Sequence, residues 1–208
     1  MKLQENYLLS NGQTIPKLGL GTWFVSDENA AQAVKDAVAL GYRHIDTAQA
    51  YANENGVGKG IRACGTARES LYLTTKLAAE IKSYEKAVAA IDQSLKTLGQ
   101  DYIDLMIIHS PKPWMKFHEA ERFLEGNREA WRALEDAYKA GKLRAIGVSN
   151  FEKADLENIL ESCTVKPMVN QVLAHCSYNT LELIDYCQSK DILVEAYSPI
   201  AHGQLLKD

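Results

Sequence analysis

The stretch GYRHIDTAQAYANENGVG, residues 41–58, begins like the end of a buried strand and then places a carboxylate directly after an apolar residue. Asp46 directly follows the apolar Ile45, and Tyr51 comes five residues later in a run of small and polar residues. Burying either a carboxylate or a phenol without partners is costly. We therefore expect the partners of Asp46 and Tyr51 to lie elsewhere in the sequence.

Short strand-like runs alternate with helical patterns along the chain. The runs cover residues 18–23, 44–48, 71–76, 104–110, 144–150, 169–172 and 193–199. The helical patterns have apolar residues three and four apart and cover residues 28–41, 84–99, 127–142, 152–162 and 180–191. This alternation is typical of parallel strands joined by right-handed crossovers. Ahead of these runs, Asn11-Gly12 between two semi-apolar segments predicts a β-hairpin.

Two architectures fit this order of elements, an open doubly wound sheet and a closed barrel. No GxGxxG segment follows the first strand-like run, which disfavours the open sheet, and the hairpin fits a plug across a barrel's bottom. We predict an α/β fold, a (β/α)8 TIM barrel with an N-terminal β-hairpin, as one domain over residues 1–208.

The predicted barrel has fewer strands than a closed one. Such barrels typically take about 250 residues, whereas this sequence has 208 residues and seven strand-like runs. The last βα unit is therefore expected to be absent from this chain. We expect a fragment, a shortened chain, or a chain completed by another copy.

Composition excludes several classes of protein. Hydrophobic residues make up 46% and charged residues 24%, which is ordinary for a globular domain. The net charge of -4 offers no basic footprint for nucleic acid. The four cysteines are scattered without a CxxC pair, so we expect neither a disulfide framework nor a metal site. The N-terminus has no apolar signal core and no run reaches membrane-spanning length, so a soluble, cytoplasmic protein is expected.

Polar residues follow the apolar part of most strand-like runs. In a barrel of this kind, residues just past the carboxyl ends of the strands face one shared pocket. The side chains expected there are Asp46, Tyr51, Lys76, His109, Ser149, Asn150, Asn170, Gln171, Tyr197 and Ser198. His44 is instead predicted to point away from the barrel interior and to be structural.

Four of these residues make a coherent acid–base set. A free phenol has a pKa near 10, and an ammonium such as Lys76 beside Tyr51 would lower it toward the operating range. Asp46 offsets the desolvation of Lys76, and His109 can hydrogen-bond an incoming oxygen. The set suits protonation of a carbonyl oxygen, with hydride supplied to the carbon by a cofactor.

These segments resemble the aldo-keto reductase family of NAD(P)H-dependent carbonyl reductases. The resemblance is carried by residues 41–58, by TTKL (74–77), IIHS (107–110), RAIGVSNF (144–151), VNQV (169–172) and VEAYSPIAHG (194–203), and so covers essentially the whole chain. It implies that Asp46, Tyr51, Lys76 and His109 form the catalytic tetrad, with Tyr51 as proton donor. It is nearest to bacterial members that reduce small aldehydes, α-dicarbonyls and keto-sugars.

The resemblance also implies where cofactor and substrate bind. The residues implied to contact the cofactor are Gly21, Thr22, Asp46, Ser149, Asn150, Gln171, Tyr197, Ser198, Pro199 and Ile200. The substrate would contact Trp23, Tyr51, His109 and Trp114; many relatives have Trp where this chain has Ser110. NADPH is implied by resemblance alone, because the family's basic residues for the 2′-phosphate belong to the absent segment, and no residue here distinguishes NADPH from NADH.

Two alternatives remain beside an active reductase with a small-molecule carbonyl substrate. The barrel could serve as a non-catalytic binding or structural subunit, because fold does not fix function. It could also be an inactive piece. A monomer is expected for the full-length parent, with self-association open to a chain this short.

Overall fold

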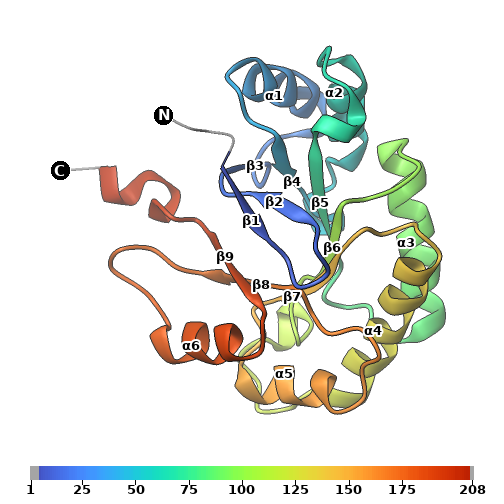
Figure 1. Cartoon of the computed structure of the whole chain (residues 1–208), viewed down its shortest axis with the longest axis vertical. Helices are drawn as coiled ribbons and strands as arrows, with labels where there is room; N and C mark the ends of the chain where they lie inside the picture. Colours follow the sequence, from blue (N-terminus) through green and yellow to red (C-terminus); the bar gives the residue numbers. More distant parts are fainter. Residues whose placement is uncertain (1–4, 207–208) are drawn as a thin grey trace.

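The computed structural model describes residues 5–206, and the ends of the predicted 1–208 domain, residues 1–4 and 207–208, lie outside them. An antiparallel hairpin of β1 (Asn6–Leu8) and β2 (Thr14–Pro16) precedes a seven-stranded parallel sheet. Its strands lie in chain order: β3 (Gly19–Gly21), β4 (His44–Asp46), β5 (Tyr72–Leu77), β6 (Leu105–Ile108), β7 (Ile146–Ser149), β8 (Val169–Leu173) and β9 (Leu193–Tyr197). The strands curve into a nearly closed barrel, with the hairpin across one end (Figure 1). The predicted α/β barrel fold with its N-terminal hairpin is confirmed.

Six α-helices in the described part of the chain connect these strands. They are α1 (Asp27–Ala39), α2 (Glu54–Ala63), α3 (Tyr84–Leu98), α4 (Leu124–Lys139), α5 (Lys153–Leu160) and α6 (Leu181–Ser189). Short 3-10 helices are η1 (Gln49–Tyr51), η2 (Arg68–Ser70), η3 (Trp114–Lys116) and η4 (Ala201–Leu206). The helix α3 ends as its sequence predicts, because Gly99 adopts a left-handed conformation with φ of 61° and closes the last turn.

Helix α2 was not among the predicted helices. Its segment, ENGVGKGIRA, holds three glycines, which are poor helix formers. Two of them are needed for packing: a Cβ on Gly56 would meet the carbonyl oxygen of Asp27 on α1, and one on Gly58 would meet that of Leu98 on α3. The glycines therefore let α2 lie directly against two neighbouring helices, and this packing outweighs their low helix propensity.

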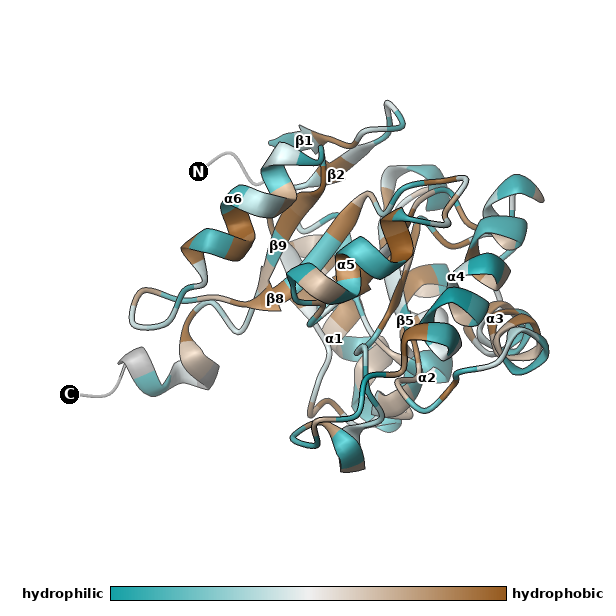
Figure 2. Ribbon diagram, turned by 90° about the horizontal axis from the view of Figure 1, so that it is seen from below, coloured by the Kyte–Doolittle hydropathy of each residue, from teal (hydrophilic) through white to brown (hydrophobic). Residues whose placement is uncertain are grey.

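The core lies within the barrel and between the strands and the helices. Strand residues such as Ile45, Leu73, Ile107 and Val148 are fully buried, and Trp131 of α4 is 2% exposed. Figure 2 shows the hydrophobic colour concentrated on strands such as β5 and β8, while the outer face of α4 is hydrophilic. Burial of this apolar surface is the main force that holds the helices on the strands.

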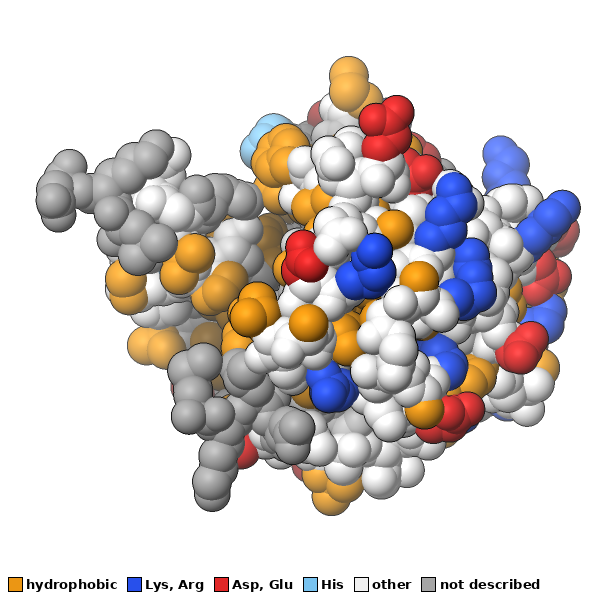
Figure 3. Space-filling view, turned by 90° about the horizontal axis from the view of Figure 1, so that it is seen from above, with side chains coloured by type: hydrophobic (Ala, Val, Ile, Leu, Met, Phe, Trp, Pro, Cys, Tyr) orange, Lys and Arg blue, Asp and Glu red, His pale blue; other side chains and the backbone are white. Residues whose placement is uncertain are grey.

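The surface carries charges of both signs. On the face seen in Figure 3, Lys and Arg side chains are interspersed with Asp and Glu side chains and with neutral ones. Among residues 5–206, none of the helices combines the length and the apolar character that crossing a membrane requires.

Candidate active site

The parallel register brings polar side chains to one end of the barrel. Asp46 is the last residue of β4 and lies level with Gly21 and Thr74 on the neighbouring strands. His109 directly follows β6, and its backbone N–H donates to the Leu77 carbonyl oxygen at 3.0 Å. Ser149 ends β7 level with Gln171 on β8. Strands that run the same way thus end around one rim, as the fold predicts.

Lys76 and Asp46 form an ion pair inside this end of the barrel. The Lys76 ammonium donates to Asp46 Oδ1 and, at 2.9 Å, to the Thr47 carbonyl oxygen. Lys76 is 1% exposed, and the Asp46 side chain is 14% exposed. The other oxygen of Asp46 accepts a hydrogen bond from Gln171 Nε2 at 2.8 Å. Burial by itself lowers the pKa of Lys76, but the nearby charges of Asp46 and Tyr51 raise the pKa overall.

Tyr51 lies against this pair at the end of η1. The Lys76 nitrogen is 5.1 Å from the centroid of the Tyr51 ring. The next residue, Ala52, has a left-handed backbone with φ of 55°, which turns the chain into α2. Burial raises the pKa of the Tyr51 phenol, and the positive charge of Lys76 offsets only part of that rise. Lys76 therefore lowers the pKa of Tyr51, as predicted. The prediction that the pKa is lowered overall is wrong, because desolvation of the phenol is the larger effect.

Two amide side chains, one buried and one half-buried, anchor the Tyr51 segment, and the prediction from sequence missed them. Asn53 is fully buried; it accepts from the Thr47 hydroxyl at 2.6 Å and donates to the carbonyl oxygens of Thr22 and Val25 at 2.9 and 2.8 Å. Gln49 accepts from the backbone N–H of Ala78 at 2.8 Å. The signal was present in AQAYANENG, where buried amides beside a tyrosine must find several partners each.

His109 completes the cluster from the next strand. Its ring lies edge-on to that of Tyr51, with centroids 5.6 Å apart. The side chain is buried, and Nδ1 has no hydrogen-bond partner within the described residues. Burial, together with the positive charge of Lys76, lowers the pKa of His109 to about 3. The imidazole is therefore neutral at physiological pH and can hydrogen-bond an oxygen without transferring a full charge.

Aromatic side chains lie beside Tyr51 and His109 at this rim. Trp23 lies 6.5 Å from the Tyr51 ring, and Trp114 lies edge-on to His109 at 5.1 Å. Both predicted tryptophans therefore reach the rim, where they are 50% and 40% exposed. The prediction missed Phe24, which stacks on Trp23 at 4.2 Å and is 82% exposed. Its φ of 66° is unusual for a bulky residue, and no local sequence signal indicates it.

The residues predicted to contact a nicotinamide form a connected network. Tyr197 donates from its hydroxyl to Asn150 Oδ1 at 2.9 Å, and Asn150 Nδ2 donates to the Ser149 hydroxyl at 3.1 Å. The Ser149 hydroxyl donates to the Gln171 carbonyl oxygen at 2.8 Å. Amides, a hydroxyl and an aromatic ring at one rim are the chemistry that a carboxamide-bearing ring requires, so these residues fit the group.

The other predicted cofactor residues flank this network. The Thr22 backbone N–H and hydroxyl both donate to the Asp46 carbonyl oxygen, at 2.9 and 3.0 Å, which ties the ends of β3 and β4 together. A Cβ on Gly21 would meet open space. Ser198, Pro199 and Ile200 follow β9, and Ser198 has a φ of 51°. Their contacts with a cofactor stay predictions.

Two residues point the opposite way from their predicted directions. His44 lies on the same side of β4 as Asp46, since strand residues two apart share a face. It is 1% exposed and bonded to the Thr74 hydroxyl at 2.8 Å inside the barrel, so its predicted outward direction is wrong. Asn170 is fully buried and donates to the Phe151 carbonyl oxygen at 3.0 Å, on the side of β8 away from Gln171.

The inward direction of His44 creates one cluster of metal-type ligands among the described residues. Ring and carboxylate atoms of His44, Asp46 and Glu195 lie within 4.8 Å of one another. The ammonium of Lys76, however, is already bonded to Asp46. A cation would lie beside that positive charge, so we assign no metal to the cluster.

Two cavities lie away from this rim. One of about 280 Å³ is bordered by Gln49 and Glu54 on the outer side of the barrel. The other, of about 470 Å³, lies between the hairpin and the opposite ends of the strands, with Arg43 and Tyr72 on its wall. We place the active site at the rim because the titratable side chains meet there.

Comparisons with known proteins point to the same family throughout. The family model described as "Aldo/keto reductase family" matches residues 17–208. The chain is 45% identical over 205 residues to a glyoxal reductase of Bacillus subtilis, covering 98% of this chain and 70% of the relative. It is 43% identical to a 9,11-endoperoxide prostaglandin H2 reductase of Trypanosoma cruzi, over 94% of this chain and 66% of the relative.

Solved structures agree with these matches. An aldo-keto reductase from a deep-sea metagenome library superposes with a TM-score of 0.88 at 40% identity, covering 96% of this chain and 70% of that one. A Bombyx mori aldo-keto reductase in complex with NADP gives a TM-score of 0.83 at 37% identity, over 94% of this chain and 66% of that one.

Proposed function

Because the chain belongs to the aldo/keto reductase family, we propose that it reduces small aldehydes and ketones to alcohols with NADPH, and that Tyr51 donates the proton. One observation carries the proposal: a phenol, an ammonium, a carboxylate and an imidazole from three neighbouring strands and their loops meet at one rim. The Lys76 nitrogen lies 5.1 Å from the Tyr51 ring centroid, and the His109 ring lies 5.6 Å from it. The names of the relatives support a carbonyl substrate, and α-dicarbonyls and keto-sugars are the proposed class.

The cofactor would lie along the carboxyl-end rim. Ser149, Asn150 and Gln171 would hold the carboxamide, and the ring of Tyr197 would face the nicotinamide. When bound, NADPH supplies the hydride that reduces the carbonyl carbon. The NADP complex of the Bombyx mori relative supports this choice of cofactor.

The chain's own residues would manage the proton. Tyr51 is protonated in this site, since burial raises the pKa of its phenol, and it would donate that proton to the carbonyl oxygen. Lys76 then stabilises the phenolate that forms, and Asp46 keeps the ammonium in place through their ion pair. His109, neutral at working pH, would hydrogen-bond the same oxygen and fix its direction. The aromatic side chains of Trp23 and Trp114 would exclude water from the carbonyl.

The test is Tyr51→Phe assayed with a small aldehyde and NADPH. Loss of a positioned proton donor costs about 10²- to 10⁴-fold in rate, so kcat should fall by at least about 10²-fold. Binding of NADPH, followed by quenching of tryptophan fluorescence, should stay near the wild-type value. Tyr186→Phe, on α6 and outside the rim, is the matched control and should leave both values unchanged.

Two outcomes would contradict the proposal. Turnover retained in Tyr51→Phe would remove Tyr51 as proton donor. Binding of NADPH by the wild type without oxidation across a panel of carbonyl compounds would favour a binding or structural subunit instead.

A further inference from the structure

A second carboxyl group lies inside the barrel beside Asp46, and the proposed reaction assigns it no part. Glu195 is on β9, two residues before Tyr197, and is level with Gln171 on β8. A carboxylate oxygen of Glu195 lies within 4.8 Å of one of Asp46 and of a ring nitrogen of His44. Its Oε2 is buried and has no hydrogen-bond partner among the described residues.

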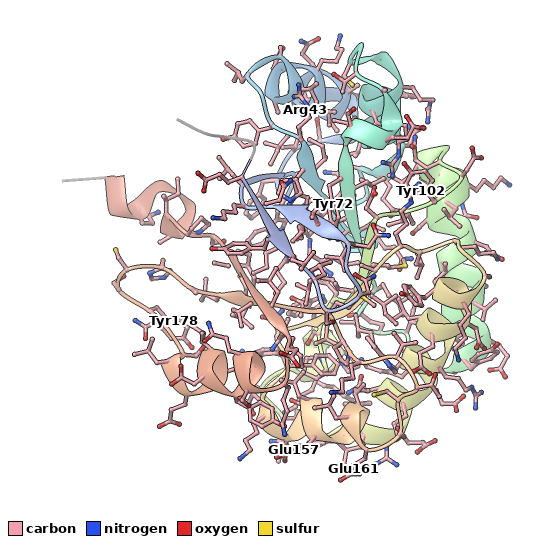
Figure 4. The ribbon with its side chains drawn as sticks, in the orientation of Figure 1. Arg43, Tyr72, Tyr102, Glu157, Glu161 and Tyr178 are labelled. Atoms are coloured by element: carbon pink, nitrogen blue, oxygen red, sulfur yellow. The ribbon has the colours of Figure 1, made fainter. Side chains whose placement is uncertain are left out.

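The ionisable groups around Glu195 come from two strands. On β4 they are His44 and Asp46, and on β5 they are Tyr72 and Lys76; Tyr72 is marked in Figure 4, near the middle of the barrel. The Lys76 ammonium is bonded to Asp46 and to the Thr47 carbonyl oxygen. An ionised Glu195 would therefore hold a buried oxygen without a donor next to a second carboxylate, which is unfavourable.

The pKa direction agrees with this geometry. Burial raises the pKa of Glu195, and the negative charge of Asp46 raises it as well; the charges of His44 and Lys76 and a hydrogen bond from Gln171 act against the rise. Two neighbouring carboxyl groups that share one buried site commonly hold one proton between them.

We propose that Glu195 is a positioning residue that stays a neutral carboxylic acid, so that Asp46 carries the negative charge that faces Lys76. This inference rests on the proposed carbonyl reduction. With one carboxylate present, the Lys76 charge acts on both Asp46 and the Tyr51 phenol. A second negative charge would hold Lys76 more strongly and make the Tyr51 phenolate harder to form, so proton donation would slow.

The experiment compares Glu195→Gln with the wild type in two measurements. Glutamine has the shape of the neutral acid and cannot ionise, so it should preserve the neutral-pH state. The first measurement is the infrared difference spectrum, which resolves the C=O stretch of a protonated carboxyl group and requires no activity. The second is the pH profile of kcat for carbonyl reduction.

Glu54→Gln is the matched control. Glu54 is a buried carboxyl group whose pKa burial also raises, and it is bonded to the hydroxyls of Thr75 and Ser94 on the outer side of the barrel. Thermal unfolding of each variant, followed by circular dichroism, checks that it folds.

We expect the wild type at pH 7 to show a protonated carboxyl band that Glu195→Gln lacks and Glu54→Gln retains. At pH 7 the kcat of Glu195→Gln should stay within about threefold of the wild type. The band should disappear at higher pH as Glu195 ionises. Wild-type kcat should then fall about tenfold further than the kcat of Glu195→Gln, because a charge that changes the pKa of the Tyr51 phenol by one unit changes its proton-transfer equilibrium by a factor of ten.

Four results would overturn the proposal. A carboxylate band from Glu195 at pH 7 would show that Glu195 is ionised and not a neutral acid. Identical pH profiles in the wild type and Glu195→Gln, or the same change in Glu54→Gln, remove the positioning role. A wild type that shows the acid band but reduces no carbonyl compound overturns the proposed function, and the positioning role with it. The band would then show that Glu195 is neutral and that the proposed carbonyl reduction is the part that is wrong.

Discussion

Replacing Asp46 with Asn should destabilise the protein strongly, and by an amount that shrinks as the pH rises. In the wild type the two Asp46 oxygens accept from Lys76 and from Gln171. An asparagine keeps one acceptor oxygen and turns an amide N–H₂ toward the other donor. The ammonium of Lys76, which is 1% exposed, would then lose the carboxylate to which it is bonded.

The size of the effect follows from the two ways the variant can respond. Removing one partner of a buried ion pair costs about 3–5 kcal/mol. Lys76 can instead fold without its proton, which costs about 1.36 kcal/mol for each pH unit below its ordinary pKa of about 10.4. The cost of folding with a neutral Lys76 is therefore an upper limit on the loss of stability, and it is about 4.6 kcal/mol at pH 7 and about 1.9 kcal/mol at pH 9. The unfolded variant binds more protons than the folded one in this range, so the stability of Asp46→Asn rises with pH relative to the wild type.

The assay is equilibrium unfolding in urea at pH 7 and pH 9, followed by circular dichroism. The double variant Asp46→Asn/Lys76→Met should recover at least half of the lost free energy of unfolding, because it removes the unpaired charge. Asp92→Asn breaks the exposed pair with Lys142, whose side chains are 52% and 43% exposed, and should cost at most about 1 kcal/mol. If Asp46→Asn costs no more than Asp92→Asn, or costs as much at pH 9 as at pH 7, the buried-pair reasoning is wrong.

Two further predictions follow from the geometry. The imidazole proton resonances of His109, assigned by their absence in His109→Asn, should not shift between pH 8 and pH 5, because its pKa lies at about 3; a titration near pH 6.5 would contradict its burial. Gly58→Ala should destabilise the protein by about 1–3 kcal/mol in urea unfolding, although alanine favours helix, because its Cβ would meet the Leu98 carbonyl oxygen; a variant as stable as the exposed control Lys59→Ala would show that α2 can move away.

The order of the elements and the main site residues could be predicted from the sequence. Each strand is a short apolar run and most helices have three- and four-residue apolar spacing, so the alternation is visible locally. The residues at the ends of those runs, such as Asp46 and His109, reach one rim because parallel strands end together. Helix α2 could not be predicted in the same way, because its glycines are explained only by the carbonyl groups of α1 and α3 that approach them.

Errors of direction had a different origin. The outward direction predicted for His44 is wrong because His44 is two residues from Asp46, and strand alternation puts residues two apart on the same face. The net shift of the Tyr51 pKa needed the depth of burial, which no sequence pattern contains. Glu195 has neighbours from distant parts of the chain, and so its place beside Asp46 was not visible in the sequence.

Sequence alone was enough to predict which segments become strands, which helices connect most of them, and that Asp46, Tyr51, Lys76 and His109 lie near one end of the barrel. These depend on local apolar periodicity and on a parallel order that repeats along the chain. The depth at which Tyr51, Lys76 and His109 are buried, and the proximity of Glu195 to Asp46, depend on the folded arrangement of the strands. Desolvation and charge interactions depend on distances between residues far apart in the chain, and those distances exist only once the strands have closed around them.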